Sequence, residues 1–387
     1  MRMKTFWRVL SYMLVAVIAA GTTAVCFVVE DLTSGDKLEQ VKACIDRYFI
    51  GEVDMDKVED VAAGAMVEAL GDEWSYYMTA EQYLSYQDTM DNSYVGVGII
   101  VAVREDGQGI DVLSVTTGGP AQAAGILAGD IIVAVDGQSV VGVDMSTLTG
   151  LVRGKEGTFV EMGLLRDGEE TVIRVERKRF HIPVVGYEML EGDVGLVSIA
   201  NFDSKCADET IAAVEALRSQ GAKALIFDVR DNPGGYKKEL IRVLDYLLPE
   251  GPLFRTEDYL GNVEGDRSDA SFVDLPMAVL MDLESYSAAE FFAAALDEYD
   301  AAITVGERTY GKGYMQVAFP LTDGSAVNLS MGKYSTPNGV SLAGVGLTPD
   351  VEVPVDEETA AKIRAGILDP AEDPQIQAAL EALGAGK

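Results

Sequence analysis

Residues 224–235 read ALIFDVRDNPGG, an apolar run followed by a turn rich in charged residues and glycine. A short apolar run bounded by such a turn is typical of a strand buried on both faces. Strands and helices alternate on either side of this stretch, and this order predicts an α/β core with a largely parallel sheet. We expect strands at 194–199, 224–229, 277–281 and 302–305, and helices at 206–219, 237–247 and 287–296.

The chain before this core carries two other patterns. From residue 94 onward, alternating β-branched residues broken by glycines predict a small β-rich domain. Between residues 36 and 90, apolar residues recur at spacings of three and four, which predicts a small helical segment. The expected β-domain strands are 95–103, 110–115, 130–135 and 158–165, with short helices at 120–125 and 145–153 and a further helix near the end of the chain at 373–383.

The composition excludes several classes of protein. The chain has 387 residues, enough for two to three domains, and 30 Lys+Arg against 63 Asp+Glu give a formal charge of −33. Such a charge repels a phosphate backbone, so we expect no nucleic-acid partner. Three scattered cysteines and one histidine are too few for a disulfide framework or a metal centre, and no cofactor is expected.

The N-terminus predicts a membrane anchor. An uncharged apolar run from Val9 to Val29 would span about 30 Å as a helix, enough to cross a bilayer. Basic residues precede the run and acidic residues follow it, which places the rest of the chain on the extracytoplasmic side of a single-pass cell membrane protein. A cleaved signal peptide is the alternative interpretation.

A glycine turn opens the β-rich domain. Backbone N–H groups at Gly96, Val97, Gly98 and Ile99 could bind a carboxylate while the following strand edge pairs with an extended peptide. The turn is followed by GGPAQAAGILAGDII at 118–132 and VDG at 135–137, and this order resembles a PDZ domain over residues 92–178. A glycine-rich hairpin that binds no ligand is the alternative.

A serine stands where a strand changes to a helix. Ser287 follows the strand AVLMD, and the N–H of Ala288 would be free to stabilise a developing oxyanion at the helix N-terminus. The alternative is structural: Ser287 and Glu290 also form a capping box, in which the hydroxyl only closes the helix.

A lysine offers the base that such a serine would need. His181 is the single histidine, and its context favours a partly buried structural role. Lys312 lies between two glycines, and Gln316 projects from the same face of an extended segment. Burial that lowers its pKa would let Lys312 act as general base. A surface lysine in a glycine hairpin is the alternative.

Together these motifs resemble those of the C-terminal processing peptidases, serine peptidases with a PDZ domain and a Ser-Lys dyad. The matching stretches are GDEWSYYM at 71–78, DVRDNPGG at 228–235, SYSAAE at 285–290, TYGKGYMQ at 309–316, TPNG at 336–339 and GVGLTPD at 344–350.

The resemblance implies an α/β multidomain fold with a crotonase/ClpP-like peptidase core. It further implies Ser287 as nucleophile, Lys312 as base and Gln316 as the residue that positions the lysine. The oxyanion hole would take the N–H of Ala288 and that of Gly234 or Gly235, and Arg153 matches a PDZ position that couples peptide binding to the active site. Two residues depart from the family segment: Tyr286 replaces an alanine and Ala289 a serine.

We therefore predict a membrane-anchored serine endopeptidase that recognises the C-termini of protein or peptide substrates through its PDZ domain. A PDZ adaptor on a degenerate, inactive peptidase core is the alternative, and a crotonase-like acyl-thioester enzyme is a third reading. A homo-oligomer or a regulatory partner is left open. The predicted parts are a cytoplasmic stub and anchor (1–30), a helical region (31–91), the PDZ domain (92–178), the peptidase core (179–355) and a helical tail (356–387).

Overall fold

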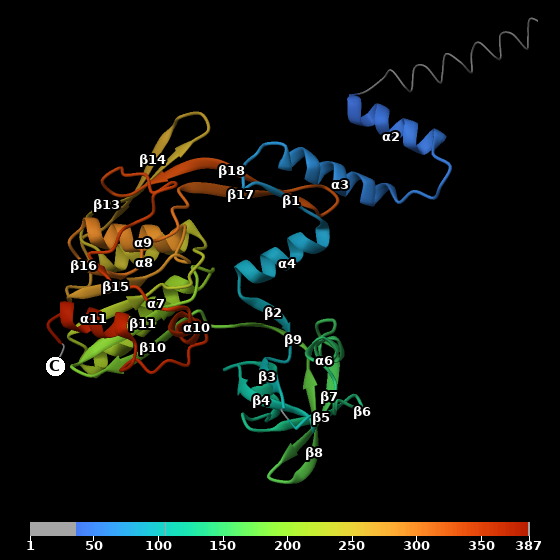
Figure 1. Cartoon of the computed structure of the whole chain (residues 1–387), viewed down its shortest axis with the longest axis horizontal. Helices are drawn as coiled ribbons and strands as arrows, with labels where there is room; N and C mark the ends of the chain where they lie inside the picture. The colour runs from blue at the N-terminus through green and yellow to red at the C-terminus, as the bar shows by residue number, and fades with distance from the viewer. Residues whose placement is uncertain (1–35, 105, 386–387) are drawn as a thin grey trace, which may run out of the picture. The chain divides into compact units, whose positions relative to one another are not determined.

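The computed structural model describes residues 36–104 and 106–385. The chain divides into two compact units, residues 1–71 and 72–387. The described part of the first unit holds helices α2 (Lys37–Tyr48) and α3 (Met55–Glu68) (Figure 1). Each helix begins at an aspartate, Asp36 or Asp54, whose side chain accepts hydrogen bonds from backbone N–H groups of the first turn. The helical periodicity predicted for this region is present.

The predicted fold class included an N-terminal transmembrane helix, and this part of the prediction is corrected here. Across residues 36–104 and 106–385, no helix combines the length and the apolar composition needed to cross a membrane. The run from Val9 to Val29 itself lies outside the described residues. The prediction rested on hydropathy and flanking charge alone, which cannot tell a retained span from other apolar leaders.

A six-stranded sheet forms the centre of the second unit, in the order β10-β11-β12-β15-β16-β19. β10 is antiparallel to β11, and the other neighbours are parallel. Alternate strand residues face opposite sides: Phe227 and Val279 pack with helices α7, α8 and α9, whereas Ile226 and Leu280 pack against α11. The strands are β10 (Val185–Leu190), β11 (Val194–Ile199), β12 (Ala224–Asp228), β15 (Met277–Met281), β16 (Ala302–Gly306) and β19 (Val351–Glu352), and the helices are α7 (Cys206–Gln220), α8 (Lys237–Leu247), α9 (Ala288–Glu298), α10 (Glu357–Arg364) and α11 (Pro374–Ala382).

A second, antiparallel sheet joins distant parts of the chain. Strand β1 (Tyr76–Met78) pairs with β18 (Ala326–Ser335), so the segment that starts at Asp72 lies against the core although the sequence analysis placed it in the N-terminal helical region. This sheet also contains β13 (Gly251–Asp258), β14 (Val263–Ser268) and β17 (Tyr314–Pro320). Helix α4 (Ala80–Met90) follows β1.

The PDZ region is a separate sheet with its own core. Strand order is β3-β4-β5-β7-β8, with β6 added to β5, so β3 is an end strand. Ile110, Ile132 and Leu164 are fully buried at its centre. A two-stranded ribbon, β2 with β9, leads into and out of the domain. The elements are β2 (Ser93–Gly96), β3 (Ile99–Val103), β4 (Ile110–Val115), α5 (Pro120–Ala124), β5 (Ile131–Val135), β6 (Gln138–Ser139), α6 (Met145–Val152), β7 (Phe159–Arg166), β8 (Glu169–Glu176) and β9 (Lys178–His181).

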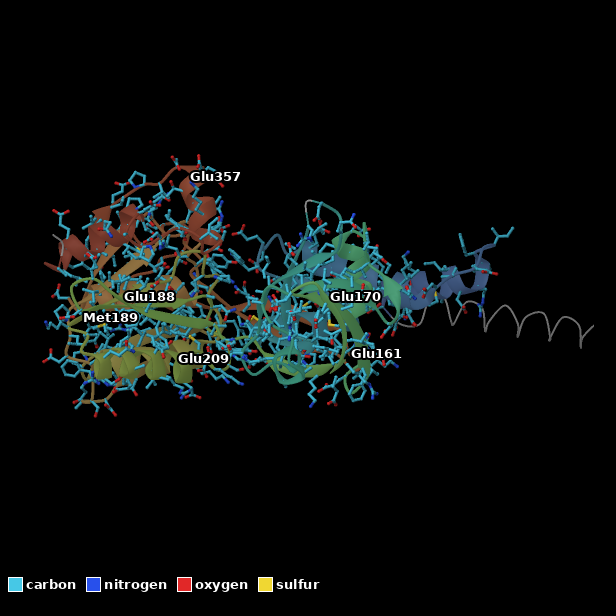
Figure 2. All side chains as sticks on the ribbon, turned by 90° about the horizontal axis from the view of Figure 1, so that it is seen from below. Glu161, Glu170, Glu188, Met189, Glu209 and Glu357 are labelled. Atoms are coloured by element: carbon cyan, nitrogen blue, oxygen red, sulfur yellow. The ribbon has the colours of Figure 1, made fainter. Side chains whose placement is uncertain are left out.

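The acidic residues are spread over the surface of several elements. Glu161 on β7, Glu170 on β8, Glu188 on β10 and Glu357 on α10 are all exposed (Figure 2). The net charge of −33 therefore belongs to both the PDZ region and the core rather than to a single tail.

Candidate active site

Ser287 immediately precedes α9 and has an unusual backbone conformation. Its φ is 58° and its ψ is −124°. A positive φ in a residue with a side chain costs about 1–3 kcal/mol, and such strain persists only where surrounding contacts enforce it. Here the N–H of Ser287 donates to Glu290 (2.9 Å) and its carbonyl accepts from the N–H of Phe291 (3.1 Å). The N–H of Ala288 has no acceptor among the described residues.

A single buried carboxylate joins this turn to the lysine segment. Oε2 of Glu290 accepts from the backbone N–H groups of Ser287 (2.9 Å) and Lys312 (2.8 Å). Oε1 accepts from the hydroxyl of Thr309 (2.7 Å) and the N–H of Gly311 (2.6 Å). Burial raises the pKa of Glu290, and the hydrogen bonds that it accepts oppose that rise. Glu290 therefore does more than cap α9, because it fixes the backbone of the predicted nucleophile and of the predicted base.

The glycines that flank Lys312 allow a neighbouring loop to pack against its backbone. A methyl group at Gly311 would lie 2.9 Å from the nitrogen of Gly346, and one at Gly313 would lie 2.6 Å from the Cβ of Ala343. From the sequence, the two glycines were expected to leave the amine of Lys312 uncrowded. The structure gives another reason, which is the close approach of two backbone segments.

The amine of Lys312 is enclosed by aromatic rings. Its Nζ lies 4.3 Å from the ring centroid of Trp74 and 5.8 Å from that of Tyr286. Burial lowers the pKa of Lys312, while the negative charge of Glu290 opposes this decrease. Within the described residues no hydrogen bond joins Nζ to the hydroxyl of Ser287, so the two residues are brought together through their backbones.

The turn at 228–235 lies directly against Ser287. A methyl group at Gly234 would be 2.8 Å from the nitrogen of Ala288. The N–H of Gly234 already donates to the side-chain oxygen of Asn232 (2.8 Å). The backbone carbonyl of Asn232 accepts from the N–H of Tyr286 (3.1 Å). The N–H of Gly235 has no acceptor in the described part of the chain. Of the two glycines proposed for the oxyanion hole, Gly235 therefore has the available donor.

Gln316 contacts another partner than the one expected. Its Nε2 donates to the hydroxyl of Ser330 (3.2 Å), and the N–H of Ser330 donates to the hydroxyl of Ser75 (3.0 Å). The same-face argument assumed a regular strand from Lys312 to Gln316. Instead, β17 begins only at Tyr314, and its register with β18 shifts before Gln316.

The predicted peptide-binding turn lies at the edge of the PDZ sheet. Gly98 has a φ of 75°, and the carbonyl of buried Val97 accepts from the N–H of Ala121 (2.7 Å). Ile99 begins β3, the end strand. An end strand offers unpaired backbone groups to an incoming peptide; binding of a peptide here stays a prediction.

Arg153 is exposed just after helix α6. The sequence analysis missed Arg177, which is buried and donates to the carbonyls of Leu151 (3.2 Å) and Val152 (2.7 Å) at the end of α6. Arg177 lies between β8 and β9, and its bonds to the end of α6 depend on tertiary packing, so no local pattern singled it out.

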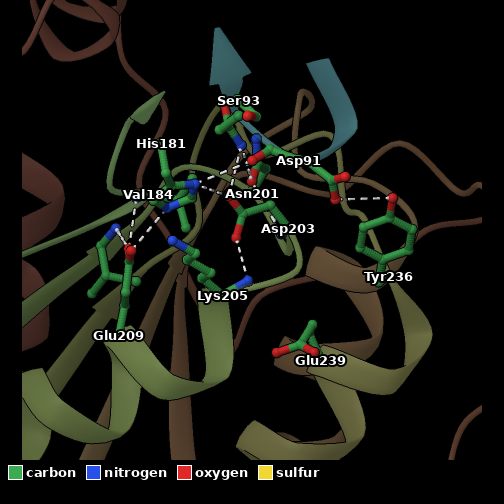
Figure 3. A network of polar contacts seen from close by, with 12 residues as sticks. Asp91, Ser93, His181, Val184, Asn201, Asp203, Lys205, Glu209, Tyr236 and Glu239 are labelled. Carbon is green, nitrogen blue, oxygen red and sulfur yellow. Dashed lines mark hydrogen bonds and ion pairs between the residues drawn. The ribbon is translucent and has the colours of Figure 1, made fainter. Parts of the chain in front are cut away.

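His181 lies at the end of the ribbon and not at Ser287. Its Nδ1 is 3.1 Å from the carbonyl of Asp91 and its Nε2 is 2.9 Å from the carboxylate of Glu209 (Figure 3). In the same network Asn92 donates to Asn201 and Asp203. The half-buried imidazole thus has the structural surroundings that were expected. No group of three or more His, Cys, Asp or Glu residues within 36–104 and 106–385 is arranged to hold a metal ion.

Comparisons with known proteins agree with these assignments of fold. The family model "Peptidase family S41" matches residues 193–353, and a PDZ model matches 112–166. The "Carboxy-terminal processing protease CtpA" of Bacillus subtilis (strain 168) is 34% identical over 320 residues, covering 82% of this chain and 68% of that protein. A "Probable CtpA-like serine protease" of Staphylococcus epidermidis (strain ATCC 12228) is 30% identical over 321 residues, and the chain spans 65% of its length.

Solved structures give the same result. The photosystem II D1 C-terminal processing protease is 26% identical, with a TM-score of 0.50, over 89% of this chain and 94% of that chain. A putative S41 protease from Bacteroides fragilis matches with a TM-score of 0.55 at 16% identity, over 83% of this chain and 90% of that one, a likeness of fold alone. This chain belongs to peptidase family S41, among the carboxy-terminal processing serine proteases that carry a PDZ domain.

Proposed function

We propose that this chain is an endopeptidase in which Ser287 attacks the substrate carbonyl and Lys312 acts as general base. Neutral Lys312 takes the proton from the hydroxyl of Ser287 as the new C–O bond forms. The ammonium then returns that proton to the leaving amine, and a water molecule, activated in the same way, releases the acyl group. The N–H groups of Ala288 and Gly235 would stabilise the oxyanion.

One observation carries the proposal: Glu290 accepts from the backbone N–H groups of both Ser287 and Lys312. A structural cap on α9 would need only the first of these bonds. The lowered pKa of the buried lysine and the strained φ of the serine support the same roles.

Substrate recognition is the second part of the proposal. The free edge of β3 and the turn at Gly96–Ile99 would bind the C-terminal region of a protein substrate as an added strand. The coupling role of Arg153, the positioning role of Gln316 and the extracytoplasmic location of the catalytic part stay predictions.

The test is degradation of an unfolded protein by the wild-type chain, Ser287→Ala and Lys312→Ala. We expect both substitutions to abolish cleavage and to leave the chain folded, with Ser287→Ala lowering the free energy of unfolding by no more than about 2 kcal/mol, the most that a helix cap contributes. His181→Ala is the matched control and should cleave like the wild type.

Three outcomes would contradict the assignment. Equal cleavage by all variants would remove Ser287 and Lys312 from the mechanism. Loss of cleavage in His181→Ala with folding intact would make the histidine the base. A folded wild-type chain that binds C-terminal peptides but cleaves none under any condition would favour the inactive adaptor.

A further inference from the structure

Three aromatic rings form a cluster, and two of them, those of Trp74 and Tyr286, lie near the amine of Lys312. The centroid of Trp74 is 5.7 Å from that of Tyr310, edge to face, and 6.4 Å from that of Tyr286. Tyr286 and Tyr310 are themselves 5.7 Å apart. The Trp74 centroid lies 4.3 Å from Nζ, closer than the Tyr286 centroid at 5.8 Å, although Trp74 is far from Lys312 in the sequence.

The position of Trp74 is fixed by its backbone. Its carbonyl accepts from the side-chain amide of Asn328 (3.0 Å), and the strand that follows it, β1, pairs with β18. The next residue, Ser75, is buried and donates to the carboxylate of Asp72. The ring is therefore held against the amine by the second sheet and not by a loose surface contact.

A ring at this distance has opposite effects on the two forms of the amine. The face of an indole carries negative charge density and attracts an ammonium, but it gives a neutral amine no comparable attraction. Proton loss therefore weakens the contact with Trp74. At the same time it converts the amine into the form that can accept a hydrogen bond from a serine hydroxyl.

We propose that Trp74, supported by Tyr286 and Tyr310, is a positioning residue that holds the protonated amine of Lys312 and releases it toward Ser287 when the proton is lost. The inference rests on the proposed role of Lys312 as base. It assigns to the GDEW segment, which precedes the PDZ domain in the chain, a part in setting the pH at which the site becomes active.

Other groups also face this amine. From α9, the carboxylate of Glu290 favours the protonated form. Burial raises the pKa of the Tyr286 phenol, whose ring lies 5.8 Å from Nζ. Glu284 and Asp231 influence the phenol of Tyr286. A substitution at Trp74 leaves the carboxylate of Glu290 in place, and a smaller ring at position 74 keeps part of the contact with Tyr286, so a graded change in titration reports the indole.

The experiment titrates Lys312 directly in the full chain carrying Ser287→Ala, which cannot digest itself under the proposed mechanism. A short pulse of an amine-acylating reagent at each pH, followed by peptide mass spectrometry, gives the midpoint at which Lys312 becomes reactive. We expect Trp74→Met, which keeps an apolar side chain but removes the ring, to lower this midpoint by about one pH unit. Trp74→Phe should lower the midpoint by less. Phe319→Leu removes an exposed ring on the same strand as Gln316 and should not change the midpoint.

The sign of the shift decides between two roles. If Trp74 only excludes water, its loss hydrates the amine and raises the midpoint toward the value of a free lysine. An upward shift, or none, would therefore overturn the proposal.

Activity separates this inference from the proposed function. In chains with Ser287 intact, kcat/KM should rise with pH through the same midpoint, since only the neutral amine accepts a proton, and the acid limb should move to lower pH in Trp74→Met. A shifted titration with an unshifted acid limb would mean that the ring holds the ammonium but that Lys312 is not the base.

Discussion

Gly234 determines how closely the turn at 228–235 can approach Ser287, the proposed nucleophile. Its φ of 93° favours glycine, and a methyl group there would lie 2.8 Å from both the nitrogen of Ala288 and the Cβ of Ser287. Gly221, at the end of α7, has nearly the same φ, 98°, but its surroundings are open. Comparing an alanine substitution at each glycine therefore separates the effect of backbone strain from the effect of close contact with Ser287.

We expect Gly234→Ala to lower kcat/KM by about a hundredfold, because displacing the turn by a fraction of an ångström moves the oxyanion donors off their target. Gly221→Ala should cost about 1–2 kcal/mol of stability and leave kcat/KM unchanged. Steady-state kinetics with urea unfolding measures both. Equal kinetic losses in the two variants would show that strain alone is responsible.

At the level of single residues, the sequence predicted the site in part. Ser287 and Lys312 stand in short motifs that can be read directly, and a helix N-terminus after a strand suggests an oxyanion donor. The aromatic partner of Lys312 could not be found in this way, because Trp74 is more than 200 residues distant in the chain. For Glu290 the motif suggested only a cap, since its bonds to Thr309 and Gly311 depend on tertiary packing.

At the scale of elements, a buried arginine links helix α11 to the turn at 228–235, which is proposed to form part of the oxyanion hole. Nη1 of Arg230 donates to Asp373 and to Gln375 (both 2.9 Å), and Nη2 donates to Asp228 (2.6 Å). Asp373 also caps α11 by accepting from the N–H of Gln375 (2.9 Å). The C-terminal helix thus supports the strand end from which the turn begins.

We expect Asp373→Asn to destabilise the chain by about 1–3 kcal/mol, since a buried arginine loses a charged partner while it keeps Asp228. It should also lower kcat several-fold by loosening the turn. Asp356→Asn is the matched control, because Asp356 caps α10 in the same way but is exposed. The measurements are urea unfolding and peptidase kinetics. If Asp373→Asn behaved like Asp356→Asn in both, α11 would not support the turn at 228–235.

Elements with strong periodicity were predicted well. Helix α8 begins and ends at the expected residues, 237 and 247. Its buried apolar residues recur at spacings of three and four, with charged residues between them. The second sheet was missed. Its strands mix charged residues and glycines with apolar ones, as in VEGDRS of β14, and they are stabilised by pairing between distant segments that no local pattern reveals.

For the whole molecule, the charge of −33 bears on the choice of substrate. Under the proposed mode of binding, local N–H groups at Gly96–Ile99 would have to attract a free C-terminal carboxylate against long-range repulsion. We expect an inactive Ser287→Ala chain to bind an apolar peptide about 10- to 100-fold more weakly when its C-terminus is amidated, because charge-assisted hydrogen bonds are lost. Fluorescence anisotropy measures this difference.

A peptide with an Asp/Glu run before its C-terminus serves as the comparison. It should bind more weakly than the apolar peptide at low salt and approach it as salt is added, since screening reduces only the long-range repulsion. Equal affinity for the free-acid and amidated peptides would show that the PDZ region reads internal sequence.

The contacts of Glu290 and Arg230 also determine when the proposed site can form during translation. The ribosome adds Ser287 before Lys312, and both before Asp373. Until Thr309–Lys312 has emerged, Glu290 lacks three of its four donors, and until Asp373 and Gln375 have emerged, the turn lacks its support. Ser287 is therefore translated before the residues that complete its proposed site, so under the proposed mechanism the growing chain would carry the serine without a working site.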